Sequence, residues 1–101
     1  MANRATDERV FPRHAEVLRS AIARAITRLG WEAKTGSDGT IAAVWTSPFF
    51  KFKDDVTILA VPAEKGGTRV RVRSVSRVGR YDFGQNAKHI RDLFTEIQKA
   101  L

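Results

Sequence analysis

The sequence predicts an α+β fold, a two-layer domain in which a four-stranded antiparallel meander sheet carries two helices on one face. Two apolar stripes at helical spacing, one toward each end of the chain, predict the helices. Between them, four β-rich stretches are separated by short turn signals, which favour antiparallel neighbours. The predicted element order is therefore α-β-β-β-β-α, with both helices covering the same side of the sheet.

The first helix is expected to follow a polar N-terminal segment. We expect residues 1–10 to form a flexible arm and residues 11–101 to form a single α+β domain. Pro12 suits a first helical turn, and Gly30 is typical of the residue that ends a helix. The apolar stripe between them comprises Ala15, Leu18, Ala21, Ile22, Ala25, Ile26 and Leu29.

Four strands are expected at residues 31–35, 40–46, 55–61 and 68–78. Glycine-rich turn signals at residues 36–39 and 64–67 separate two pairs of them. The 55–61 stretch is apolar on both sides of its period, which indicates a central strand. In the last strand, Arg69, Arg71 and Arg73 alternate with smaller residues, which predicts an arginine ladder on the open face of the sheet.

The second helix is predicted from a stripe close to the C-terminus. Its apolar positions are Phe83, Ala87, Ile90, Phe94, Ile97 and Leu101, with Leu93 beside them. Before the third strand, Phe49, Phe50 and Phe52 fall in a loop, where they either plug one end of the core or form an exposed apolar lip.

The net charge of +7 is concentrated in one part of the chain. Residues 64–91 contain eight Lys or Arg against two acidic residues. A local positive field of this kind attracts phosphate groups, nucleic acid, acidic lipid or an acidic protein, and a basic face kept for solubility is the alternative. The lack of cysteine excludes a disulfide framework and a thiolate metal site. No cofactor and no metal site are expected.

The segment VRSVSRVGRYDFGQN, at residues 72–86, predicts an organised polar corner between the last strand and the last helix. Asp82 and Gln85 have the spacing of a capping box, in which the carboxylate accepts from the first N–H groups of a helix. Arg77 is expected to fold back onto Asp82 or onto one of Asp54 and Asp55. The residues with an expected structural role are Asp54, Asp55, Gly79, Asp82 and Gly84.

The same corner is also a candidate anion site. A helix N-terminus presents N–H groups and positive potential, and arginine forks match phosphate or carboxylate. The candidate anion-binding residues are Arg73, Ser76, Arg77, Arg80 and Asn86. Because the Asp82 carboxylate would use the same N–H donors, capping and anion binding compete there.

Two other functions stay open. A nucleic-acid-binding module would use the arginine ladder, but a sheet that binds single strands normally adds stacking aromatics, and Trp45 is the only aromatic in a predicted strand that could share that face. An enzyme would use Asp54, Asp55 and Asp82, although consecutive strand residues point to opposite faces. His14 and His89 have no spaced partner, and both are expected to be solvated surface side chains.

The chain also resembles a known family. The resemblance rests on Trp31, the turn at residues 39–41, the stretch TSPFFKFKDDVTI at residues 46–58, and RVRVRSVSRVGRYDFGQNAKHI at residues 69–90. The pattern SR-x-G-x-x-D-x-G-x-N is the most specific part. These features resemble the uncharacterised bacterial and plastid domain-of-unknown-function family fourteen ninety-nine. The resemblance implies no activity, since none is established for that family.

These observations lead to an expected function and location. We expect a non-enzymatic binding module whose partner is a small anionic ligand, an anionic lipid or an acidic protein, with nucleic acid less favoured. No apolar run approaches the roughly 18 residues of a membrane span, and no signal peptide is visible, which favours the cytoplasm. The resemblance implies the alternative of a cell-envelope-associated domain, since family members often carry an anchor or export signal ahead of it.

Overall fold

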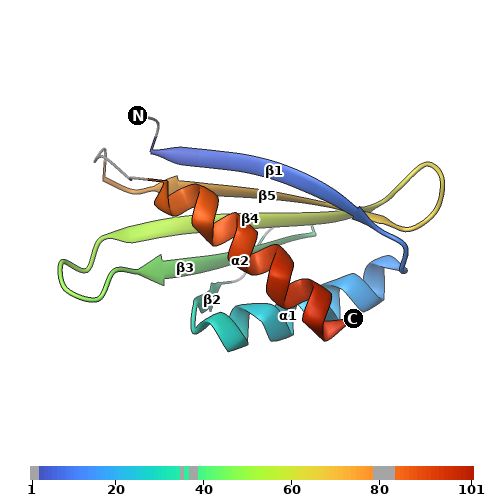
Figure 1. Ribbon diagram of the computed structural model, residues 1–101, viewed down its shortest axis with the longest axis horizontal. Coiled ribbons are helices and arrows are strands. Elements are labelled where there is room, and N and C mark those ends of the chain that lie inside the picture. Colours follow the sequence, from blue (N-terminus) through green and yellow to red (C-terminus); the bar gives the residue numbers. More distant parts are fainter. Residues whose placement is uncertain (1–2, 35, 37–38, 79–83) are drawn as a thin grey trace.

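The computed structural model describes residues 3–34, 36, 39–78 and 84–101. In these residues, a five-stranded antiparallel sheet carries two helices on one face (Figure 1). The α+β class, the antiparallel pairing and both predicted helices are confirmed. The strands are β1 (Arg4–Phe11), β2 (Glu32–Lys34), β3 (Thr40–Thr46), β4 (Lys53–Pro62) and β5 (Thr68–Ser76), and the helices are α1 (Ala15–Leu29) and α2 (Gln85–Ala100).

The predicted strand count of four and the predicted flexible arm are wrong, because residues 4–11 form β1. This strand pairs with β5 along its whole length, from Arg4 opposite Val75 to Phe11 opposite Thr68. Its sequence, RATDERVF, lacks the apolar alternation by which strands are recognised. Backbone hydrogen bonds and cross-strand ion pairs hold it instead, as is common for a charged edge strand.

The strand order β1-β5-β4-β3-β2 places β4 in the centre of the sheet, as its apolar sequence predicts. Strands β2 to β5 form the predicted meander, in which each strand pairs with the next. Helix α1 connects the two edge strands, β1 and β2, across one face. The first and last strands in the sequence, β1 and β5, therefore lie side by side in the sheet.

The core lies between the sheet and the two helices. Along β5, Val70 and Val72 are fully buried while Arg71 and Arg73 are exposed, so the helix-covered face and the open face alternate as predicted. Phe11 at the end of β1 contacts Phe94 of α2, with ring centroids 6.2 Å apart. These two phenylalanines are among the largest fully buried side chains, so β1 is part of the core rather than an appendage.

Two predicted glycine positions have clear structural reasons. Gly30 ends α1 in the left-handed conformation, with its N–H group bonded to the Thr27 carbonyl. Gly67, in the hairpin between β4 and β5, has a φ of +79° and packs against β1 so closely that a Cβ atom would lie 2.4 Å from the Phe11 carbonyl oxygen. The hairpin therefore requires glycine at position 67 both for its conformation and for the contact with β1.

Candidate functional site

Adjacent aspartates at the start of β4 point to opposite faces of the sheet. Asp54 is fully buried on the helix-covered side, and Asp55 is partly exposed on the open side. This divergence follows from the two-residue period of a strand. The pair therefore cannot act together as two neighbouring carboxylates, and each belongs to a different polar group.

Asp54 belongs to a buried pair with His89 of α2. His89 Nε2 lies 2.9 Å from Asp54 Oδ2, and the His89 side chain is only 2% exposed. The prediction of a solvated His89 is therefore wrong. The ring is enclosed by Trp31 and Trp45, whose centroids lie 5.6 and 4.6 Å from its own. His14, in contrast, is exposed as expected.

The hydrogen bonds of His89 indicate which of its two ring nitrogens carries the proton. The amide nitrogen of Gln85, one helical turn earlier, lies 3.5 Å from His89 Nδ1. Since an amide nitrogen can only donate, this contact favours the tautomer in which Nδ1 accepts and Nε2–H donates to Asp54. Gln85 thus acts as a hydrogen-bond donor to His89.

A second buried polar group joins α2 to β5 and the N-terminal end of the chain. Ser74 Oγ donates to Asn86 Oδ1 at 2.6 Å, and Asn86 Nδ2 donates to Ser76 Oγ at 3.1 Å and to the Asn3 carbonyl at 2.9 Å. Asn86 and Ser74 are fully buried. We call Asp54, Ser74, Ser76, Asn86 and His89 the buried polar cluster. Its side chains satisfy one another, as buried polar groups must.

Part of the predicted corner lies outside the described residues, namely Gly79, Arg80 and Asp82. Helix α2 begins at Gln85, and Gly84 occupies the N-cap position with a φ of +82°. This left-handed conformation favours glycine and gives Gly84 a structural role. The expected capping by Asp82 stays a prediction.

Arg77 folds back onto a carboxylate, as the sequence predicts, and the partner is Asp55. Its Nε and Nη2 atoms each lie 2.9 Å from an Asp55 oxygen, which gives a bidentate pair on the open face. This hydrogen bonding, together with the Asp55 charge, raises the pKa of Arg77. On the edge strand β2, the hydrogen bond from Lys34 and its charge lower the pKa of Glu32.

The arginine ladder of β5 is partly neutralised by one carboxylate of β1. Glu8 lies opposite Arg71, accepts from its Nη2 at 2.9 Å, and also lies 3.2 Å from Arg69 Nε. Trp45 faces the helices, where it contacts His89, rather than the ladder. The open face thus lacks the aromatic that the nucleic-acid interpretation needed from Trp45.

Arg73 has different neighbours from the other members of the ladder. It lies opposite Thr6 of β1 and Thr57 of β4, so hydroxyl groups flank it on both sides. Within the part of the chain that the structure describes, no carboxylate pairs with it. We call the depression of about 230 Å³ at this place the open-face hollow, and its lining residues are Thr40, Thr57, Leu59, Arg71 and Arg73.

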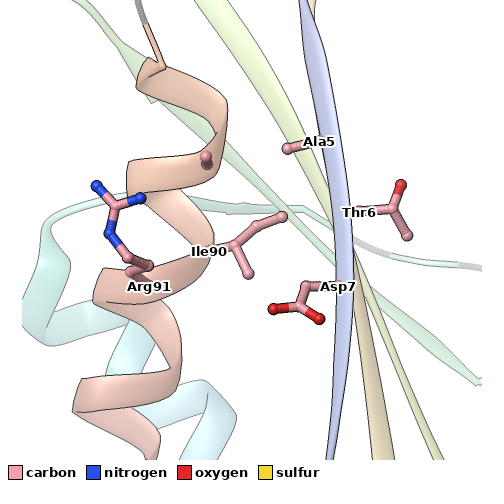
Figure 2. Close-up of a pocket in the computed structure, with 6 residues that line it drawn as sticks. Ala5, Thr6, Asp7, Ile90 and Arg91 are labelled. Carbon is pink, nitrogen blue, oxygen red and sulfur yellow. The ribbon is translucent and has the colours of Figure 1, made fainter.

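A second depression, of about 280 Å³, lies between β1 and α2 (Figure 2). Its lining residues are Ala5, Thr6, Asp7, Ala87, Ile90 and Arg91. In Figure 2, Ile90 points toward β1 and the Asp7 carboxylate points toward the helix, while Arg91 extends to the other side of α2. This hollow is therefore mainly apolar and is lined by one carboxylate, Asp7, and one arginine, Arg91, whose guanidinium is directed away from it.

The structure divides the predicted anion-binding residues between the two faces of the sheet. Arg73 and Arg77 are exposed on the open face, whereas Ser76 and Asn86 belong to the buried polar cluster on the helix-covered face. Sequence reasoning missed Thr57, Thr6 and His89. The DDVT segment and the spacing of Gln85 and His89 by one helical turn were the available signals, but the partners come from distant strands.

Among the described residues, no group of three or more His, Cys, Asp or Glu side chains is arranged to hold a metal ion. Likewise, neither described helix is long and apolar enough to cross a membrane.

Comparisons with known proteins identify a family and a fold. The family model described as "Protein of unknown function (DUF1499)" matches residues 2–97 of the chain. No protein with a curated description matches the chain in sequence.

Several solved structures share the fold, and two of them illustrate the likeness. One is the adenylate sensor from AMP-activated protein kinase in complex with 5-aminoimidazole-4-carboxamide 1-beta-D-ribofuranotide (ZMP), with a TM-score of 0.63, 14% identity, and coverage of 90% of this chain and 93% of that chain. The other is TTHA0849 from Thermus thermophilus, with a TM-score of 0.52, 13% identity, and coverage of 96% of this chain and 95% of that chain. At these identities the likeness concerns the fold alone.

Proposed function

The chain belongs to the DUF1499 family of proteins of unknown function, and we propose that it is a non-enzymatic binding module that holds an anionic group on the open face of its sheet. The anionic group is a phosphate or carboxylate of a small molecule, a lipid head or an acidic protein. The observation that carries the proposal is the environment of Arg73, an exposed guanidinium flanked by Thr6 and Thr57 and paired with no carboxylate of the described residues.

The open-face hollow has the groups that such a ligand requires. Arg73 supplies a planar fork of N–H donors that matches two oxygens of a phosphate or carboxylate. Thr57 adds a hydroxyl on one side, and Leu59 adds an apolar surface for the rest of the ligand. Arg71 contributes positive potential, although Glu8 already occupies its fork.

The proposal revises the corner that the sequence predicts. Arg73 is kept as the main ligand-binding residue. Arg77 contributes only at a distance, because Asp55 binds both ends of its fork. Ser76 and Asn86 would act indirectly, since the buried polar cluster anchors α2 and the N-terminal residue Asn3 to β5. Arg80 stays a candidate, and it lies outside the described residues.

The alternatives are less well supported. Glu8 neutralises part of the ladder, which reduces the field that a nucleic-acid backbone would experience. Asp54 and Asp55 face opposite sides of the sheet, so an enzyme would have to use the Asp54–His89 pair. That pair is buried and lines neither the open-face hollow nor the depression between β1 and α2.

Affinity for a single anion should be weak, because exposed charge pairs contribute only about 0–1 kcal/mol each. We therefore expect millimolar binding of inorganic phosphate and tighter binding of pyrophosphate. Chemical-shift titration of both anions against wild type, Arg73→Ala and Arg91→Ala tests the proposal. Arg91 is the matched control, since it is an exposed arginine on α2 and its loss changes the net charge equally.

Arg73→Ala should weaken pyrophosphate binding at least fivefold, whereas Arg91→Ala should leave it unchanged. Glu8→Gln should strengthen it, because the Arg71 fork is then released to the hollow. Equal binding by all these proteins, or shifts centred away from β4 and β5, would overturn the proposal.

A further inference from the structure

The loop between β3 and β4 exposes two aromatic side chains. Phe49 is 90% exposed and Phe50 is 77% exposed, more than any other large apolar side chain among the described residues. Isolated exposed apolar residues are ordinary on protein surfaces, but two adjacent aromatics at a loop tip form a continuous apolar surface. The loop projects beyond the end of the sheet (Figure 1).

Local bonds hold this loop in its exposed conformation. The Ser47 N–H donates to the Phe52 carbonyl, and the Ser47 hydroxyl accepts from the Phe52 N–H, both at 2.8 Å. Between them, Lys51 has a φ of +58°, a conformation that non-glycine residues seldom adopt. Phe50 stacks on Phe52 with ring centroids 5.7 Å apart. The loop therefore has a defined shape with Phe49 and Phe50 facing outward.

The charges around the two phenylalanines have one sign. Lys51 follows them directly and Lys53 begins β4, while residues 46–53 contain no acidic residue. The nearest carboxylates in sequence are already engaged, since Asp54 pairs with His89 and Asp55 pairs with Arg77. The tip thus combines an apolar surface with two lysines: Lys51, which pairs with no carboxylate of the described residues, and Lys53, which donates to the Thr46 hydroxyl and whose charge helps to lower the pKa of Glu32.

We propose that this loop docks the domain on an anionic lipid bilayer, with Phe49 and Phe50 in the interfacial region and Lys51 and Lys53 against the lipid phosphates. Exposed apolar side chains next to Lys or Arg are the combination that binds bilayer surfaces. The charge complementarity favours a bilayer, since basic residues beside the apolar tip are attracted to the negative surface of anionic lipid.

This inference goes beyond the proposed function and does not depend on it. The open-face hollow lies at Arg73 and Thr57, whereas the tip, at Phe49 and Phe50, lies in the loop that precedes β4. The two sites can therefore be removed separately.

Sedimentation with vesicles tests the inference on the whole chain. Wild type should bind vesicles of phosphatidylcholine mixed with phosphatidylglycerol and should bind pure phosphatidylcholine at least tenfold more weakly. Phe49→Ser/Phe50→Ser should reduce partitioning into the mixed vesicles at least tenfold, and Lys51→Ala should reduce it about fivefold, as expected for one basic residue at an anionic surface. Val10→Ser/Val61→Ser is the matched control, because these exposed apolar residues both lie opposite Arg69, toward the other end of the sheet, and it should bind as wild type does.

A Phe50→Trp variant gives a readout of insertion. Brominated acyl chains should quench its fluorescence beyond the quenching of the native Trp31 and Trp45 in wild type. Vesicle binding that survives the loss of both phenylalanines would show electrostatic adsorption only and would overturn the inference. So would an absence of vesicle binding, or a wild-type dimer that Phe49→Ser/Phe50→Ser converts to monomer. Arg73→Ala should leave vesicle partitioning unchanged, which separates a failure here from a failure of the anion site.

Discussion

Asp54 and Asp55 are adjacent in the sequence and lie in opposite environments: one is buried against His89, 2.9 Å away, and the other forms an exposed bidentate pair with Arg77. Two chemically identical side chains on one strand thus form two different kinds of polar contact, a buried hydrogen bond to a histidine and an exposed ion pair with an arginine. This contrast allows the cost of burial to be measured within a single element.

Asp54→Ala should lower the free energy of unfolding by about 3–5 kcal/mol, because it removes one partner of a buried pair and leaves His89 enclosed. Asp55→Ala is the matched change and should cost at most about 1 kcal/mol, since the pair it breaks is exposed. Urea denaturation followed by tryptophan fluorescence measures both, as Trp31 and Trp45 contact His89. Equal costs for the two variants would contradict the assignment of Asp54 to the core.

Asn86→Ala should lower the free energy of unfolding by at least about 1–3 kcal/mol, because Ser74, Ser76 and the Asn3 carbonyl lose a shared partner. Hydrogen exchange should also become faster at the start of β1, which Asn86 ties to α2 through Asn3. Gln98→Ala, near the exposed end of the same helix, serves as a control and should change stability by less than about 0.5 kcal/mol. Unaltered exchange in β1 would argue against a structural role for Asn86.

Phe11→Ala should lower the free energy of unfolding by about 3–5 kcal/mol, as for other buried phenylalanines. Val10→Ala, at the neighbouring and half-exposed position, should have little effect. The two results together test whether β1 is a core strand or the flexible arm that its composition suggests. A Phe11→Ala variant with the same unfolding temperature as wild type would indicate that this segment is a flexible arm.

The pKa of Glu32, followed by NMR of its side-chain carboxyl carbon, should lie below the ordinary value for glutamate. Lys34→Ala should raise it, since the Lys34 hydrogen bond and charge are the largest causes of the shift. Because the folded-state pKa is the lower one, the associated stability is present above the unfolded-state pKa and is lost as the pH falls through the folded-state pKa. Lys65→Ala, in the β4–β5 hairpin, should leave the pKa of Glu32 where it is.

The elements whose signals are local could be predicted from the amino-acid sequence. Apolar stripes, the glycine at the end of α1 and the alternation of β5 depend only on neighbours a few residues away, so both helices, β2 to β5 and the central place of β4 were predictable. The pairing of Arg77 with a nearby carboxylate also followed, because a long side chain at a polar corner has few alternatives.

The features that join distant segments became visible in the folded chain and were not predictable from local sequence. β1 has no apolar period of its own, and its stability comes from β5, α2 and the Gly67 hairpin. The burial of His89 could not be recognised from its own helix, because its buried partner Asp54 lies 35 residues away. Whether Arg73 faces a carboxylate or a hydroxyl depends on strand register, and a shift of one residue would exchange the two faces. Charge and burial of a side chain are set by its neighbours in space, which local sequence does not specify.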